Sequence, residues 1–318
     1  KPGIGAEAVA ARGWLAAHKW LLARRVSQLG ILTLFLLGPL VGVWIVKGNL
    51  TFSYTLNVLP LTDPYILLQT LLTRHMPETK AFVGAAIVLA FYLLVGGRVF
   101  CSWVCPVNMV TDAAAWLRRR LGIKGGAHIS RSARYWILAM TLVLAAVTGT
   151  LAWELVNPVS MFHRGLIFGF IQKQDQFWPM VGAIHYIVFG IGAAWGVILA
   201  VFLFDVFVMK DGWCGHLCPV GAFYSLIGKV SLVRTAAVKR TACNDCMDCF
   251  AVCPEPQVIR PALKGVDGAG PVIADANCTN CGRCIDVCSK DVFAFGTRFG
   301  NKAEKVSQPA QKMAAACK

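Results

Sequence analysis

The apolar residues of the chain gather in four long stretches that are separated by polar connections. A helix needs roughly 17–25 apolar residues to cross the hydrocarbon core of a bilayer, and each stretch reaches that length. The pattern therefore predicts an α-helical integral membrane protein with four transmembrane helices, and it assigns the membrane domain to residues 26–232. The predicted helices cover residues 26–46, 81–97, 135–156 and 181–209.

The residues before the first stretch follow a helical pattern of their own. Trp14, His18 and the leucines around them recur at helical spacing, with basic residues between them. Such a segment is typical of a helix that lies in the membrane interface, so residues 1–25 are predicted to form one on the inner leaflet. Residues 301–318 are polar and aperiodic, which predicts a disordered tail, and Cys317 within it is interpreted as incidental.

The predicted membrane domain contains an internal repeat. One Cys-x3-Cys-Pro motif follows the second stretch and another follows the fourth. The outer connections also resemble each other, because residues 62–64 and 156–158 each place an Asp-Pro or Asn-Pro pair before an apolar segment. Two helix pairs related by an axis along the membrane normal would produce this pattern and bring both motifs together on the cytoplasmic side. The motif cysteines are Cys101, Cys105, Cys214 and Cys218.

Composition and charge agree with a membrane protein. The chain is 57% hydrophobic and 15% charged, with a mean hydropathy of +0.60, which excludes an ordinary soluble domain. Of its 31 Lys and Arg residues, 26 fall on one side of the predicted helices and 5 on the other. Because basic loops stay in the cytoplasm, both termini and the central loop are predicted to lie inside. Topology thus explains the net charge of +15, and no basic run carries the interleaved aromatics of a nucleic-acid site.

Residues 233–300 contain the strongest motif in the chain. Two runs with the spacing C-x2-C-x2-C-x3-C begin at Cys243 and Cys278; proline follows the first run, whereas Ser289 follows the second. In such paired runs, three cysteines bind one 4Fe-4S cluster and the fourth binds the other cluster. We therefore predict a cytoplasmic ferredoxin-like domain with two clusters. The first cluster is assigned to Cys243, Cys246, Cys249 and Cys288, and the second to Cys278, Cys281, Cys284 and Cys253.

The cysteines leave two further questions open. A pair of structural zinc sites would also use four cysteines each, although zinc ribbons usually separate two pairs by a longer loop. Cysteines four apart on a helix share a face, so the two Cys-x3-Cys-Pro motifs together could hold a third metal centre. The same cysteines could instead be small packing residues beside a proline kink.

These features together resemble the NapH family, the integral-membrane iron-sulfur quinol dehydrogenase subunit of periplasmic nitrate reductase systems. The resemblance rests on four spans, two Cys-x3-Cys-Pro motifs and the carboxyl-terminal cluster runs, and it covers nearly the whole chain. It implies a multi-pass protein of the bacterial inner membrane that oxidises menaquinol or ubiquinol and passes electrons towards periplasmic nitrate reductase. It also implies a NapG-type periplasmic ferredoxin subunit as the close partner, and a tetrahaem cytochrome of the NapC type as a further one.

A quinol site needs a proton acceptor beside an apolar wall. The outer connections offer Asp63 and Glu154, the latter at the expected end of the third helix, and these are the candidate catalytic residues. Each carboxylate could instead cap a helix or pair with an arginine, Arg74 or Arg164. The competing inner site consists of His185 and Asp205.

A different class of function uses the same cluster runs. A membrane assembly or regulatory factor would use its clusters to reduce a metal or a partner's thiol, and it would not react with quinol. The runs themselves do not separate this class from a quinol-oxidising subunit, whereas quinol-dependent cluster reduction does.

Overall fold

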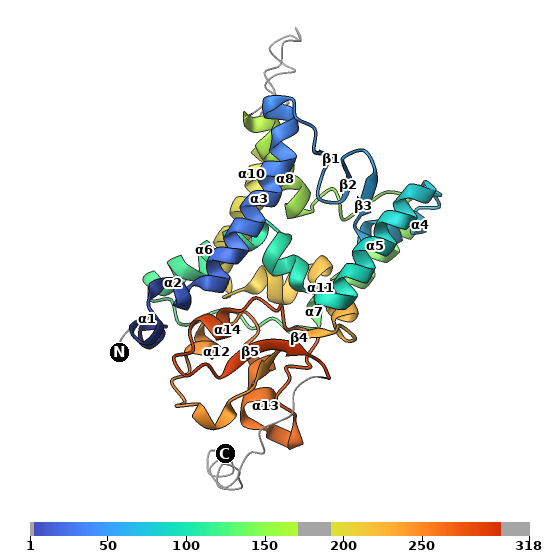
Figure 1. Ribbon diagram of the computed structural model, residues 1–318. Coiled ribbons are helices and arrows are strands. Elements are labelled where there is room, and N and C mark those ends of the chain that lie inside the picture. Colours follow the sequence, from blue (N-terminus) through green and yellow to red (C-terminus); the bar gives the residue numbers. More distant parts are fainter. Residues whose placement is uncertain (1–2, 171–191, 300–318) are drawn as a thin grey trace. The chain divides into compact units, whose positions relative to one another are not determined.

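The computed structural model describes residues 3–170 and 192–299, and it divides the chain into two compact units (Figure 1). The cysteine-rich unit contains both cluster runs, together with the amino-terminal segment and the end of the second apolar stretch. The helical unit contains most of the apolar helices. The cysteine-rich unit comprises Lys1–Val26, Tyr92–Trp103 and Tyr224–Lys318, and the helical unit comprises Ser27–Phe91 and Val104–Phe223.

Helix α3, Lys19–Val41, is the one helix among the described residues that is long and apolar enough to cross a membrane. It begins seven residues before the predicted boundary at residue 26 and ends before residue 46. Its end is set by Gly42, whose positive φ of 76° suits glycine and whose N–H closes the last turn on Gly38. Val46 instead starts strand β1, so the predicted end of the first helix is wrong.

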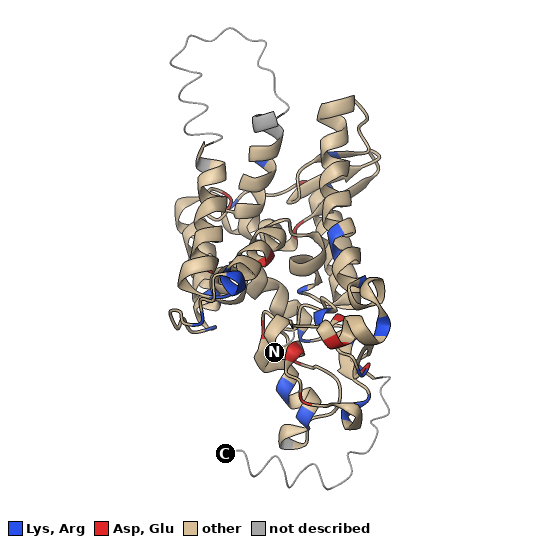
Figure 2. Ribbon diagram, turned by 90° about the vertical axis from the view of Figure 1, so that its left-hand side faces the viewer, with Lys and Arg blue, Asp and Glu red and all other residues tan. Residues whose placement is uncertain are grey.

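Of the other apolar helices, α5 has the predicted length but begins and ends two residues earlier, whereas α7 is shorter than predicted; charged residues are few along them (Figure 2). Helix α7 ends at Thr148 because Gly149 adopts a left-handed φ of 67° and donates its N–H to Ala145. The predicted third helix over residues 135–156 is therefore too long, and Glu154 lies in the following turns. Residues 181–191 of the predicted fourth helix lie outside the described residues. The bounds are Thr79–Val95 for α5, Ala133–Thr148 for α7 and Ala193–Leu203 for α10, which continues into the π-helical turn η3, Phe204–Val208.

The connection between α3 and α5 holds a small sheet that the hydrophobic pattern did not predict. Its three antiparallel strands lie in the order β1-β2-β3 and lead into helix α4. Helix α8 occupies the corresponding place in the connection that follows α7. The bounds are Val46–Gly48 for β1, Phe52–Thr55 for β2, Leu59–Thr62 for β3, Pro64–Leu72 for α4 and Pro158–Phe170 for α8.

Helices α4 and α8 begin in the same way. The Asp63 carboxylate accepts a hydrogen bond from the Tyr65 N–H at 2.9 Å, and the Asn157 side-chain oxygen accepts one from the Val159 N–H at 3.1 Å. Each cap is followed by proline, which suits a first helical position because no N–H is needed there. The repeated Asp-Pro and Asn-Pro pairs therefore act as matching helix starts.

Each of the two Cys-x3-Cys-Pro motifs begins with a single π-helical turn. The spacing of the cysteines had suggested an α-helical turn. In the second motif the Cys218 N–H bonds to the Trp213 carbonyl at 2.9 Å, five residues back. Such turns are rare and often occur at functional sites. Turn η1 covers Phe100–Val104 and precedes α6, Val107–Arg120; turn η4 covers Trp213–Leu217 and precedes α11, Pro219–Gly228.

The amino-terminal segment is not the single interfacial helix predicted for residues 1–25. It forms α1, Ala6–Arg12, and α2, Trp14–Ala17, before α3 begins. Gly13, with a φ of 80°, interrupts the helix between them. This segment packs on the ferredoxin-like part, where Arg12 pairs with Asp291 at 2.9 Å and donates to the backbone carbonyl of Asp286 at 2.6 Å.

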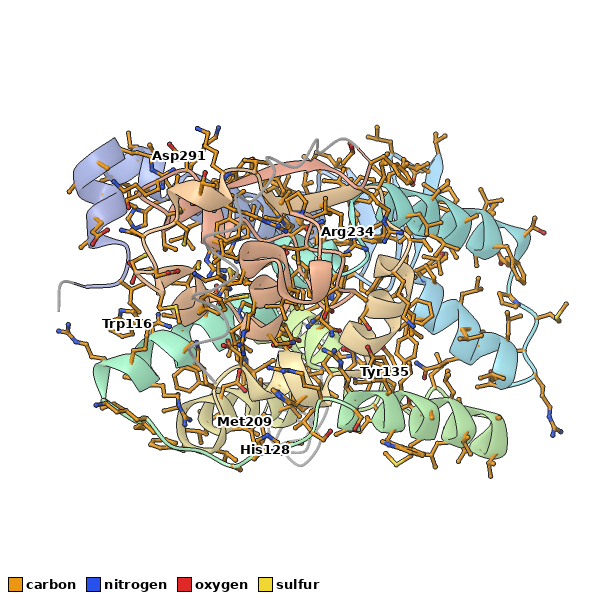
Figure 3. All side chains as sticks on the ribbon, turned by 90° about the horizontal axis from the view of Figure 1, so that it is seen from below. Trp116, His128, Tyr135, Met209, Arg234 and Asp291 are labelled. Carbon is orange, nitrogen blue, oxygen red and sulfur yellow. The ribbon has the colours of Figure 1, made fainter. Side chains whose placement is uncertain are left out.

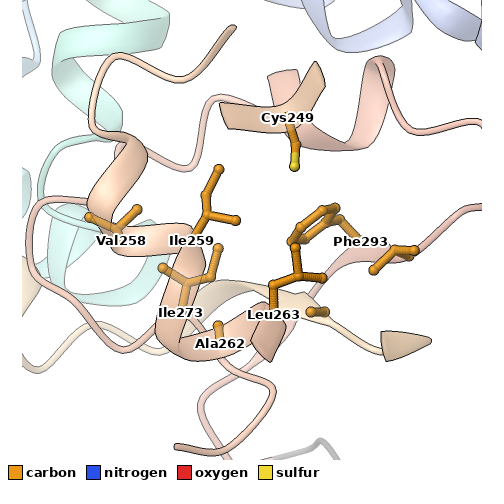
Figure 4. Packing of buried hydrophobic residues seen from close by; sticks show 9 residues of the cluster. Cys249, Val258, Ile259, Ala262, Leu263, Ile273 and Phe293 are labelled. Carbon is orange, nitrogen blue, oxygen red and sulfur yellow. The ribbon is translucent and has the colours of Figure 1, made fainter. Parts of the chain in front are cut away.

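The ferredoxin-like part is built on one antiparallel strand pair, β4 with β5, and on short helices, of which α12 and α14 lie within the two cluster runs (Figure 1). Its core is a compact cluster of buried aliphatic side chains around Phe293, and the thiol of Cys249 points into it (Figure 4). The bounds are Val233–Ala237 for β4, Asp248–Val252 for α12, Ile259–Lys264 for α13, Arg283–Asp286 for α14 and Phe293–Thr297 for β5.

Candidate functional site: two cysteine-lined cavities

The first cavity gathers four thiols from both cluster runs. Three come from the first run, at the start of α12, and the fourth comes from the residue that closes the second run. The remaining wall is mostly apolar, with side chains such as Phe250, Leu263 and Phe293. The cavity encloses an empty volume of about 360 Å³, part of it open to solvent. Its cysteines are Cys243, Cys246, Cys249 and Cys288.

The second cavity has the complementary set. Three of its thiols come from the second run, around α14, and one comes from the end of the first run. Its empty volume is also about 360 Å³, and its wall includes Val258, Ile259 and Ile273. The cysteines are Cys253, Cys278, Cys281 and Cys284. The structure thus groups the eight cysteines in the interleaved sets that the spacing predicts, and their ligation of clusters stays a prediction.

The loops that carry these thiols use unusual backbone conformations. Asp245 and Met247 have positive φ angles of 55° and 67° in the first run, and Asn280 and Gly282 have 47° and 74° in the second. A non-glycine residue in this region is uncommon and is often found at a functional site. Two features disfavour a side chain at Gly282. Its φ is positive, and a Cβ there would lie 2.6 Å from the Trp20 side chain.

Burial raises the pKa of the cavity thiols. It raises the pKa of Cys249 to about 12 and that of Cys278 to about 11, and it raises the pKa of Cys253 and Cys284 well above the ordinary value. Neighbouring thiols act in the same direction, whereas backbone N–H groups, such as that of Asn280 towards Cys278, act against it. Without a bound group these thiols are protonated, so a ligand must bring positive charge to stabilise four thiolates.

Four thiols on a largely apolar wall fit a 4Fe-4S cluster. Iron supplies the compensating charge. The packed aliphatic core keeps water away from the side of each cavity that faces it. Within residues 3–170 and 192–299, no three His, Cys, Asp or Glu side chains form a group of the kind that holds a metal ion. The eight cysteines instead surround two cavities.

The Cys-x3-Cys-Pro cysteines are divided between the two units. Cys101 belongs to the cysteine-rich unit, and Cys105, Cys214 and Cys218 belong to the helical unit. In the helical unit, Cys105 is buried and its carbonyl accepts a hydrogen bond from the Gln28 amide at 3.2 Å. A common site for the four thiols therefore stays a prediction.

The turn that carries Cys101 is hydrogen-bonded to the loop of the second cavity. The Ser102 hydroxyl donates to the Thr279 carbonyl at 2.8 Å, and the Trp103 indole N–H donates to the Asn280 carbonyl at 3.1 Å. Thr279 and Asn280 lie between Cys278 and Cys281, two thiols of that cavity. A direct connection therefore runs from the first Cys-x3-Cys-Pro motif to the second cavity.

Aromatic and charged side chains strengthen the same connection. The ring of Trp20 makes an edge contact with Trp103 at a centroid distance of 6.1 Å and another with Phe295 at 4.7 Å. Arg98, directly after the second apolar stretch, forms a buried ion pair with Glu255 at 2.7 Å and donates to the Asn277 carbonyl at 2.8 Å. Sequence reasoning missed these roles, because an arginine or tryptophan beside an apolar stretch usually marks the membrane surface.

The candidate quinol residues have structural partners in the helical unit. Asp63 is buried and caps α4, which confirms the capping alternative for this residue. Glu154 accepts hydrogen bonds from the Asn157 amide at 3.1 Å and from the Ser160 hydroxyl, at the start of α8. Of the competing pair, His185 lies outside the described residues, and the buried Asp205 carboxylate accepts a hydrogen bond from the Trp213 N–H at 2.9 Å.

Comparison with known proteins gives matches for the segments that carry the Cys-x3-Cys-Pro motifs and for the segment that carries the cluster runs. A family model described as a 4Fe-4S binding domain matches residues 80–124 and 188–236, and one described as a 4Fe-4S dicluster domain matches residues 242–292. The chain is 47% identical to the ferredoxin-type protein NapH of Haemophilus influenzae, over 92% of this chain and 94% of that protein. The chain belongs to this family of ferredoxin-type proteins.

The family also includes proteins with another name. The Escherichia coli NapH is 46% identical over 96% of this chain and 98% of its own. The methylamine utilization ferredoxin-type protein MauN of Paracoccus denitrificans is 51% identical over 92% of this chain and 95% of its own. No solved structure matches the chain. Membership in the NapH and MauN family makes this chain an iron-sulfur electron-transfer protein.

Proposed function

We propose that this protein is a multi-pass inner-membrane subunit that takes electrons from menaquinol or ubiquinol and passes them on through iron-sulfur centres. The observation that carries the proposal is the connection between the Cys101 turn and the second cavity. That turn follows the apolar helix α5 by five residues, and its Ser102 and Trp103 side chains bond directly to the loop between Cys278 and Cys281. Electrons that arrive at this end of α5 are thereby next to a cluster site.

The eight cavity cysteines hold two 4Fe-4S clusters in this proposal. Each cluster supplies one-electron oxidation and reduction when bound. The protein's own contribution is to fix the thiols, exclude water with the aliphatic core and donate backbone N–H groups to the sulfurs, as the Asn280 N–H does to Cys278. The two cavities share one core cluster, which holds them at a fixed separation.

A third metal centre at Cys101, Cys105, Cys214 and Cys218 belongs to the same proposal. Each of the two segments that match the 4Fe-4S binding domain contains one Cys-x3-Cys-Pro motif. Both motifs also adopt the same π-helical turn. Matching turns in two copies of one segment support a shared role for the four cysteines more strongly than separate packing roles.

For the quinol site, Glu154 is now a stronger candidate proton acceptor than Asp63. Asp63 is occupied as the cap of α4, whereas the hydrogen-bond partners of Glu154 are the neutral side chains Asn157 and Ser160. A carboxylate held by neutral donors can accept a proton without breaking a buried ion pair. Both residues lie in the outer connections of the predicted topology, where protons from quinol would leave to the periplasm.

The proposed partners are a NapG-type periplasmic ferredoxin subunit and, beyond it, a NapC-type cytochrome and the periplasmic nitrate reductase. The relatives named MauN support a second candidate, in which the same electron transfer serves methylamine utilization. Nucleic acid has no place in either proposal. A membrane factor that reduces a metal or a partner's thiol, without quinol, remains the alternative class.

One experiment separates these functions. Membranes that contain the full chain are given a reduced quinone, and cluster reduction is followed by EPR, with and without the NapG-type subunit. The proposal predicts quinol-dependent cluster signals that a Trp103→Phe substitution slows without loss of iron. A chain whose clusters accept electrons from dithionite but never from quinol would instead support the assembly or regulatory factor.

Topology has its own test. Under the predicted orientation, a cysteine placed by Val58→Cys, at a side chain that is 81% exposed, reacts with a membrane-impermeant thiol reagent from the periplasm, whereas one placed by Gly125→Cys does not. Both positions lie in connections between apolar helices. The opposite labelling pattern would put the cluster domain outside and overturn the predicted orientation.

A further inference from the structure

The two cysteine cavities differ sharply in the charges around them. Asp245 is the charged residue that lines the first cavity, and it pairs with the exposed side chain of Lys264. The second cavity is lined by Glu255 and Arg283. Two further arginines, Arg98 and Arg234, approach its loops from neighbouring elements, as the following contacts show.

Arg98, three residues after the end of α5, contacts the chain segments that carry the cysteines of the second cavity. Its side chain is 2% exposed, and its guanidinium bonds to the Glu255 carboxylate at 2.7 Å and to the carbonyl of Asn277 at 2.8 Å. Glu255 lies two residues after Cys253, and Asn277 directly precedes Cys278. The guanidinium therefore sits against both chain segments that bring these thiols into the cavity.

Arg234 lies on strand β4 (Figure 3) and contacts the chain segment that precedes Cys278. Its side chain is 1% exposed and bonds to the carbonyl of Asp275 at 3.1 Å and to that of Gly228. Both hydrogen-bond partners are backbone carbonyls, which carry no full charge, and the nearby Asp275 carboxylate balances only part of the charge of Arg234. Arg234 and Arg98 both act on the Cys278 thiol by their charge.

We propose that Arg98 and Arg234 raise the reduction potential of the centre in the second cavity, so that it is reduced before the centre in the first. Reduction adds one negative charge to a cluster, and a buried positive charge nearby stabilises the reduced form. Glu255 offsets part of the effect of Arg98, and Asp275 offsets part of the effect of Arg234. The first cavity has no comparable excess of positive charge among its described lining residues.

This inference rests on the proposed occupancy of both cavities by 4Fe-4S clusters, and it deepens the proposed function by giving the centres an order. The centre that is reduced first lies in the second cavity, whose loop is hydrogen-bonded to the Cys101 turn. Electrons that enter the domain therefore settle beside the end of α5.

The test is a potentiometric titration of the full chain, purified anaerobically in detergent and followed by EPR. Dithionite supplies the electrons, so the result does not depend on reaction with quinol. Arg234→Gln should lower the equilibrium constant for reduction of the second-cavity centre about tenfold. For one electron, this change lowers the higher of the two midpoint potentials by about 59 mV. Arg98→Gln combined with Glu255→Gln removes the ion pair as a unit and should shift the same potential less, and iron and sulfide analysis confirms that both clusters are retained.

Lys264→Gln is the matched control at the first cavity. It removes a positive charge at the opposite site and should lower the other midpoint, leaving the higher one unchanged. The inference is overturned if Arg234→Gln shifts the lower potential, or neither potential, in protein with full iron content, or if the unaltered chain holds fewer than two clusters. Absence of quinol-driven reduction with the predicted order of potentials would refute the quinol proposal alone.

Discussion

Gly97 is the position where a single methyl group should do most damage to the connection between α5 and the cluster domain. A Cβ at this residue would overlap the Tyr224 carbonyl oxygen and lie 2.5 Å from the Gly228 nitrogen and 3.0 Å from the Gly228 Cα. All of these are backbone atoms, which cannot rotate away as a side chain does. The close approach lets the segment before Arg98 lie directly against the segment before β4.

The magnitude follows from this geometry. Overpacking a well-packed site typically costs about 1–3 kcal/mol, and occasionally more. Because the obstructing atoms are backbone on both sides, we expect Gly97→Ala to cost about 3 kcal/mol. For a unit of this size, each kcal/mol lowers Tm by roughly 2–4 °C, so the substitution should lower Tm by roughly 6–12 °C.

The assay is thermal loss of the visible iron-sulfur absorbance of anaerobic protein in detergent, with circular dichroism measured in parallel. Gly270→Ala is the matched control, since Gly270 lies exposed in the same unit and no atom comes within 4 Å of its Cβ position. The control should melt within about 1–2 °C of the unaltered chain. Equal melting temperatures for the two variants would refute the packing of Gly97 against Gly228, and with it the structural basis of the connection.

Three further predictions concern the thiols, the connection and the quinol site. Cys253→Ala should deplete the second cluster, although Cys253 belongs to the first run, and Cys288→Ala should deplete the first cluster. Iron analysis and EPR would show the reverse pattern if each run bound its own cluster. Trp103→Phe removes one indole hydrogen bond and should slow quinol-driven cluster reduction several-fold at unchanged iron content; an unchanged rate would exclude a role for the contact. Glu154→Gln should slow quinol oxidation. Asp63→Ala should lower the free energy of unfolding by about 1 kcal/mol, whereas Asp63→Asn can still cap α4 and should leave it almost unchanged. Slow quinol oxidation in Asp63→Asn would instead favour Asp63 as the proton acceptor.

The grouping of the cluster cysteines was predictable because it is local. Within each run, three thiols at intervals of three residues are held on one short loop, and the fourth follows a short helix. Spacing alone therefore indicated that Cys253 would cross to the second set and Cys288 to the first. The structure lines the two cavities with these two sets.

Helix ends were less predictable, because they depend on single residues inside long apolar patterns. The apolar stretch continues past Thr148, yet the positive φ of Gly149 ends α7 there. A similar glycine, Gly42, ends α3 before the predicted boundary. Hydrophobicity sets where a helix can be buried, whereas a glycine can end the helix inside a region that remains apolar.

Long-range contacts were not predictable from periodicity at all. The Asp286 carboxylate accepts hydrogen bonds from the N–H groups of Trp20 and Leu21, more than 260 residues earlier in the chain. The pattern of residues 1–25 indicated an amphipathic segment, and this pattern suits packing on a protein surface as well as on a membrane surface. Only the tertiary partners distinguish the two.

The connection at the end of α5 also bears on where electrons can go. The charge distribution predicts a cytoplasmic cluster domain, whereas the proposed acceptor is periplasmic. If the second cavity holds the electron first, as the arginines around it favour, the electron rests beside Ser102 and Trp103 and not at the far side of the domain. The Cys101 turn then lies between that electron and the apolar helices. A third centre at the Cys-x3-Cys-Pro cysteines would be the next acceptor on a route towards the periplasmic face of the predicted topology. Without a third centre, the two proposed clusters would act on the side of the membrane where the cluster domain lies.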